Sequence, residues 1–133
     1  TTWLTRAADG SSLADLAVEA STPEQLTDSI FLRFFGRFPT AAEHAVFVPA
    51  LAEGFAERIV PAAERRPAEV WPLLPRVTWS NHLRSEANVI QQEWERRARQ
   101  GPPADPRLRA AWREAYEDFV WSVVNQREFV WMP

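Results

Sequence analysis

The chain has 133 residues, carries a formal net charge of −3 and is 46% hydrophobic. Its length is that of one ordinary domain, and its apolar content excludes a disordered tail. The interspersed charges lack the basic patch of nucleic-acid binders, and no apolar run reaches the roughly 20 residues that span a bilayer. Cysteine and lysine are absent, which excludes disulfides, thiol nucleophiles, cysteine-bound metals, Schiff-base lysines and a Walker lysine.

The first two predicted helices both have clear start signals. Residues 1–9 are expected to be irregular, and Ser11 or Ser12 is expected to cap a short helix. A capping-box pattern starts the second helix at Thr22, completed by the glutamine three residues later, and Gly36 is expected to end it in a left-handed conformation. Apolar residues form a wide face on this helix, which predicts that it is central and buried on more than one side.

A second capping box, Thr40 with Glu43, predicts a third helix, which Pro49 is expected to kink or break. A proline-punctuated connector follows over residues 61–78. Because its spacer residues are apolar, we expect it to pack onto the body of the domain.

Two longer helices are predicted in the second half of the chain. From Trp79, apolar residues recur at spacings of four, four, three and four, which places Trp79 and Trp94 in the core. Asp105 is expected to cap the last helix, whose buried row includes Trp112 and which ends at Asn125 or the next residue.

These elements predict an all-α fold. Short connections favour a compact, bundle-like packing of about five to six helices with the proline-rich connector. We expect residues 1–133 to form a single helical domain that is the C-terminal part of a larger protein.

The histidines offer one weak metal-binding pattern. His82 and Glu86 lie four residues apart on the predicted fourth helix, so one turn could present both to a metal, the alternative being a surface pair. A zinc site needs three or four ligands and no second histidine-rich segment exists, so no metal or cofactor is predicted. His44 is expected to be exposed or partly packed. Nucleophile-elbow and phosphate-loop patterns are missing as well, although a catalytic pair of carboxylates stays open.

The turn after the second helix carries a more specific hypothesis. Arg37 stands in a short turn before Pro39, and its planar fork suits a carboxylate. We expect it to pair with Glu43 or with Glu128 near the chain end. The alternative is that Arg37 bonds only the carbonyls at the end of the helix.

Seven tryptophans are the unusual feature of the composition. Trp121 is out of phase with the buried row of its helix, and Trp3 and Trp131 lie near the chain ends. These three are the candidates for a partner-docking or ligand-binding surface, since exposed indoles stack on sugars or cover apolar protein surface.

Two stretches carry a resemblance to a known family. Residues 30–43 resemble the Gly-Arg-x-Pro-Thr-x-x-Glu stretch of a family of large planctomycete secreted proteins, domain of unknown function 1553. Residues 118–129 look like that family's closing Trp-x-leucine-x-Asn-x-x-Glu-Phe signature. The matching residues are Arg37, Pro39, Thr40, Glu43, Trp121, Asn125, Glu128 and Phe129.

The resemblance implies an extracytoplasmic location, periplasmic or secreted, and a C-terminal place in a longer chain. It implies no catalytic residues. Many family members carry cytochrome c-like domains upstream, but this chain has no Cys-x-x-Cys-His, so a haem would be bound elsewhere. Residues 61–107 have no counterpart in the matched stretches and look like an insertion.

Taken together, the sequence favours a non-catalytic helical structural or interaction module whose partner is the rest of its parent chain or another protein. The first alternative is a ligand-binding domain, for example for a carbohydrate, which requires exposed tryptophans beside polar side chains in one cleft. The second is a metal-dependent enzyme domain, which requires His82, Glu86 and a third acid to converge.

Overall fold

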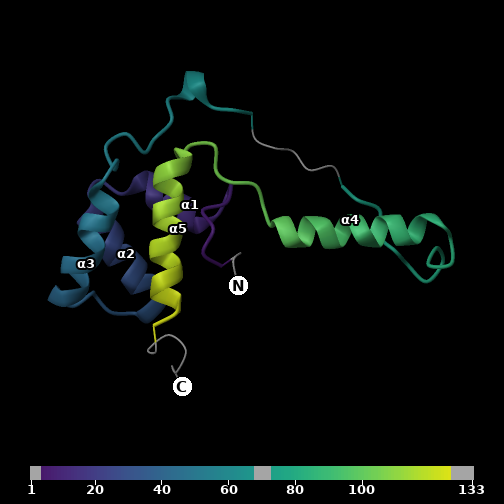
Figure 1. Cartoon of the computed structure of the whole chain (residues 1–133), viewed down its shortest axis with the longest axis horizontal. Coiled ribbons are helices and arrows are strands. Elements are labelled where there is room, and N and C mark those ends of the chain that lie inside the picture. Colours follow the sequence, from purple (N-terminus) through teal and green to yellow (C-terminus); the bar gives the residue numbers. More distant parts are fainter. Residues whose placement is uncertain (1–3, 68–72, 127–133) are drawn as a thin grey trace. The chain divides into compact units, whose positions relative to one another are not determined.

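The computed structural model describes residues 4–67 and 73–126. Of the described residues, 56% are helical; they form five α-helices and one short 3₁₀ helix and include no strand. The all-α prediction is thereby confirmed. None of the described helices has the length and apolar character needed to cross a membrane. The elements in chain order are α1 (Ser12–Glu19), α2 (Pro23–Phe35), α3 (Ala41–Ala52), η1 (Ala62–Glu64), α4 (Glu86–Gln100) and α5 (Ala110–Val124) (Figure 1).

The chain divides into two compact units. The first comprises Thr1–Ala68 together with Ala104–Pro133, and the second comprises Glu69–Pro103. The first unit therefore holds four of the five α-helices and the 3₁₀ helix η1, and the second is built around α4.

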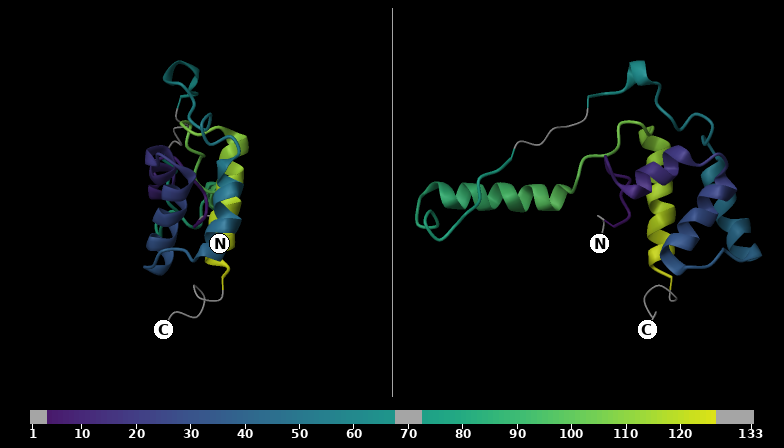
Figure 2. Two further views of the ribbon diagram at one scale, coloured as in Figure 1. Left: turned by 90° about the vertical axis from the view of Figure 1, so that its left-hand side faces the viewer. Right: turned by 180° about the vertical axis from the view of Figure 1, so that it is seen from behind.

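In the first unit, α3 packs against both α2 and α5, α2 also contacts α5, and α1 contacts α2 (Figures 1 and 2). Ile30 and Phe31 of α2 are fully buried, which confirms the central position predicted for this helix. Trp112 of α5 is 5% exposed, as predicted. The core continues through the aromatic rings of Phe55, Tyr116 and Phe119, which are all buried.

Local start signals place the first two helices as expected. The Ser11 hydroxyl accepts the N–H three residues on, and Thr22 does the same for Gln25 at 3.2 Å. The Gln25 side chain accepts from Ser21 N rather than from Thr22 N, so only half of the predicted capping box forms. Gly36 ends α2 with a φ of 67°, the left-handed conformation that glycine adopts without strain.

The third helix starts with a complete capping box, in which Thr40 accepts from Glu43 N and Glu43 accepts from Thr40 N. It then runs through Pro49 to Ala52, so the break that the proline pattern allowed does not occur. Both Pro49 and the residue one turn earlier, Ala45, are exposed. Water can therefore solvate the carbonyl that a proline leaves without its helical partner.

The approach to α5 differs from the prediction. Asp105 does not cap the helix, which begins at Ala110. Instead its carboxylate accepts from Arg107 N at 2.8 Å, a local turn. The backbone of residues 105–109 is then held by two earlier segments: Asp105 N donates to Ala7 O, Val60 N to Arg107 O, and Arg109 N to Arg58 O. These long-range bonds keep residues 105–109 out of the helix.

In the second unit, α4 begins at Glu86 and not at Trp79 as predicted. Residues 78–82 form a turn instead, and Trp79 and Trp94 are 89% and 43% exposed, so their predicted place in a core is wrong. Leu73 in the connector is fully exposed, so the packing expected of this side chain is not found; residues 68–72 of the connector lie outside the described residues. Helical periodicity identifies the apolar side of a segment, but it does not say whether anything covers that side.

Candidate functional site

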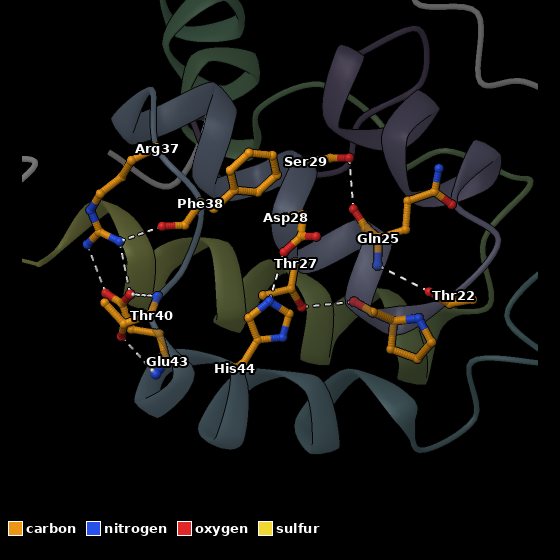
Figure 3. A network of polar contacts seen from close by, with 11 residues as sticks. Thr22, Gln25, Thr27, Asp28, Ser29, Arg37, Phe38, Thr40, Glu43 and His44 are labelled. Carbon is orange, nitrogen blue, oxygen red and sulfur yellow. Dashed lines mark hydrogen bonds and ion pairs between the residues drawn. The ribbon is translucent and has the colours of Figure 1, made fainter.

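The most connected side-chain cluster links the end of α2 to the start of α3 (Figure 3). The Arg37 guanidinium donates from both terminal nitrogens to the two Glu43 oxygens, each at 3.0 Å. It also donates to Phe38 O at 2.9 Å, and its carbon lies 5.3 Å from the ring centre of Phe35. The hypothesis of an Arg37–Glu43 pair is confirmed. The alternative partner, Glu128, lies outside the described residues.

Both carboxylate oxygens of Glu43 accept hydrogen bonds that hold the local structure. Thr40 N adds a further bond at 2.6 Å, and Pro39 stands directly before this cap residue. Hydrogen bonds from Arg37 lower the pKa of Glu43 to about 2; burial opposes the shift, and bonds from Thr40 reinforce it. A carboxylate that stays ionised and is bonded in this way suits a fixed helix–helix connection better than proton transfer.

Histidine 44 makes a second link between the same helices. Its Nε2 lies 2.8 Å from a carboxylate oxygen of Asp28 on α2 (Figure 3), and both side chains are about one-third exposed. His44 was expected to be exposed or partly packed, and it is partly packed.

The weak metal candidates do not assemble a ligand set. His82 lies in the turn before α4 and is exposed; its Nδ1 is 2.5 Å from Trp79 O, and its ring stacks on the Trp79 indole at 4.8 Å. Glu86 is the first residue of α4 and is exposed. Among the described residues, no three histidine, aspartate or glutamate side chains cluster as metal ligands.

Of the residues predicted to belong to the closing family signature or to the exposed tryptophan surface, the structure describes Trp121 and Asn125. Trp121 lies on α5 and is 52% exposed, in agreement with its out-of-phase position. Asn125 ends the helix, and its amide donates to Trp121 O at 2.8 Å. Glu128, Phe129, Trp3 and Trp131 lie outside the described residues.

Sequence reasoning missed a buried cation. Arg58 is 7% exposed, and its guanidinium donates to carbonyl oxygens of Ala17 at 2.8 Å, Ala20 at 2.5 Å, Val18 and Phe55. Burial lowers the pKa of this guanidinium, which still stays protonated. Arg58 thus binds the C-terminal carbonyls of α1, where a positive charge is favoured.

A second missed group joins chain segments that are distant in sequence. Arg107 donates to both oxygens of Asp105 and, at 2.7 Å, to Asp15 of α1. Burial opposes ionisation of Asp105, which is 1% exposed, but the hydrogen bonds from Arg107 outweigh it and lower the pKa. The only signal in the sequence was an arginine two residues after an aspartate, which many exposed loops also contain.

The turn before α4 combines internal order with exposed apolar side chains. Asn81 accepts from Thr78 N at 2.6 Å and donates to Arg76 O at 3.0 Å. Trp79 and Leu83 extend outward, each about nine-tenths exposed. We call residues 76–84 the aromatic turn.

A hollow runs along α4. Its lining is Gln92, Glu95, Arg96, Arg99 and Gln100, and no tryptophan, histidine or serine belongs to it. Comparison with protein-family models, with curated proteins and with solved structures gave no match.

Proposed function

We propose that the chain is a non-catalytic helical module that docks through its second unit, either on the rest of a longer parent chain or on another protein. One observation carries this proposal: residues 73–94, which include a hydrogen-bonded turn and the start of α4, leave large apolar side chains in solvent. They are Leu73, Trp79, Leu83, Val89 and Trp94. Exposed apolar surface of this kind marks interaction sites in folded proteins.

The polar groups of the first unit support a structural role. Arg37, Arg58 and Arg107 each bind carboxylates or carbonyls that fasten helices and segments to one another. These guanidinium groups donate hydrogen bonds to atoms of the fold itself, whereas catalytic groups must converge on a space where a substrate fits. The likeness of residues 30–43 and 118–129 to the planctomycete secreted family supports an extracytoplasmic location.

Hydrogen exchange tests the proposal. The amides of residues 73–94 are measured in this chain alone and in the same chain as part of its full-length protein, with residues 12–52 as the internal control. Docking predicts slower exchange in 73–94 within the larger protein and little change in the control helices. Equal exchange of 73–94 in both proteins excludes the rest of the parent chain as the docking surface and leaves another protein as the partner.

A further inference from the structure

The charges around the aromatic turn restrict the kind of surface it fits. Residues 70–85 contain two arginines and no aspartate or glutamate. Those arginines, Arg76 and Arg84, flank Trp79 and Leu83 and are exposed. A matching surface therefore needs an apolar centre with acidic neighbours.

The chain itself carries such a surface on α5. Glu114, Asp118 and Trp121 are all exposed and lie at intervals of four and three residues, which places them on one helix face. The single cation of this helix, Arg113, is half-buried; it lies 3.4 Å from Glu117 and, at 3.9 Å, also contacts Glu114, whereas Asp118 has no ion pair with it. The exposed face of α5 thus presents one large aromatic side chain beside two acids.

We propose that the aromatic turn of one copy docks on the exposed α5 face of a second copy, and that the reverse contact forms in the same dimer. In this contact Trp79 and Leu83 cover Trp121, and Arg76 and Arg84 face Glu114 and Asp118. This inference rests on the proposed docking role of the second unit and names its partner as another molecule of the same chain.

Area and symmetry favour the reciprocal arrangement. A stable interface buries about 800 Å² on each partner, whereas one exposed tryptophan supplies about 150–250 Å². One turn on one helix face falls short of that area. In a two-fold dimer each copy contributes its turn once and its α5 face once, so the contact is made twice.

The order within the turn lowers the cost of binding. The Thr78 and Asn81 bonds close the turn on itself, and the ring of His82 stacks on one face of the Trp79 indole. A preformed turn loses less conformational entropy on docking than a flexible loop does.

Charge reversal in the whole chain, followed by analytical ultracentrifugation, tests the dimer. The wild type is expected to show a concentration-dependent monomer–dimer equilibrium that weakens as salt is added. Arg84→Glu and Asp118→Arg each place like charges together, so each should raise the dimer Kd at least about tenfold. Both positions are exposed, and circular dichroism verifies that the helices remain.

Mixing the two variants gives the decisive measurement. In a heterodimer of Arg84→Glu with Asp118→Arg, one contact is native and the other has its charges exchanged, so association should return. Arg66→Glu alters the net charge by the same amount at an exposed site outside the turn and should leave the dimer intact. Trp79→Ala should weaken association, and mixing it with either charge variant should not restore the dimer.

Three results overturn the inference: a monomer at every concentration, a dimer that is indifferent to both reversals, or a mixture that does not reassociate. If the chain is monomeric but residues 73–94 are protected within the full-length protein, the second copy is excluded as partner and the docking role stands. If the double variant Arg84→Glu with Asp118→Arg regains stability as a monomer, the contact lies within one chain and the dimer is wrong.

Discussion

Replacement of Arg58 by methionine tests whether this one cation holds the end of α1 to the core. Methionine retains most of the apolar stem but removes the donors. The Phe55 carbonyl keeps a bond from the backbone N–H of residue 58, and Val18 O lies near the surface. The carbonyls of Ala17 and Ala20 lose a buried partner.

The magnitude follows from those two carbonyls. A buried acceptor left without a donor costs about 1–3 kcal/mol, so the pair costs about 2–6 kcal/mol. Removing the cation also removes the cost of burying it, which offsets part of the loss. We therefore expect Arg58→Met to lower the free energy of unfolding by about 3 kcal/mol, a large part of the roughly 5–15 kcal/mol typical of a domain.

Urea unfolding followed by far-ultraviolet circular dichroism measures this change as a lower midpoint at an unchanged slope. Arg58→Lys keeps a charge with fewer and differently directed donors, so it should fall between wild type and Arg58→Met. Arg66→Met, at an exposed arginine, should stay within about 0.5 kcal/mol of wild type. If Arg58→Met matches the Arg66 control, the carbonyls do not depend on the guanidinium and the reasoning fails.

Three further outcomes follow from the described contacts. Glu43→Gln should lower the free energy of unfolding by only about 1–2 kcal/mol, because solvent screens the partly exposed Arg37. The pKa of Glu43 is lowered from 4.5 to about 2, so its contribution to stability is present above pH 4.5 and disappears as the pH falls towards 2. Acid titrations of the wild type and the variant compare the two stabilities over this range. Tyr116→Phe removes the buried bond to Leu13 O at 3.0 Å and should cost about 1–2 kcal/mol in urea unfolding, whereas unchanged stability would mean that water replaces the hydroxyl. Trp112→Ala should cost about 3–5 kcal/mol and Trp79→Ala less than about 0.5 kcal/mol in the monomer; similar costs for the two would contradict their assigned burial.

Features that depend on neighbouring residues could be predicted from the sequence. The caps at Ser11, Thr22 and Thr40 form between groups three residues apart, and Gly36 needs only its own conformational freedom. The Arg37–Glu43 pair was also within reach, because a turn and one capping box fix how the two side chains meet.

Features that depend on distant segments could not be predicted. Arg58 reaches a carbonyl 41 residues earlier, and Arg107 reaches Asp15 across 92 residues. The chain has fifteen arginines, and the residues next to Arg58 and Arg107 do not indicate that these two bind distant groups. The start of α5 was misplaced for the same reason, because bonds from residues 7 and 60 hold the preceding segment.

The exposed aromatic turn is not explained by the stability of its own unit. Among residues 73–103, Ala87 is the one buried apolar side chain. The described side-chain support of α4 comes from ion pairs such as Glu93 with Arg96 and Arg97 and from the hydrogen bond that Trp94 Nε1 donates to Pro75 O. A helix of this length is marginal in water without packing. Trp79 and Leu83 add nothing to that support while they are exposed, yet the turn that presents them is closed by side-chain hydrogen bonds. Ordered presentation of unburied apolar groups reduces solubility, so a surface that covers them accounts for the turn better than internal packing does.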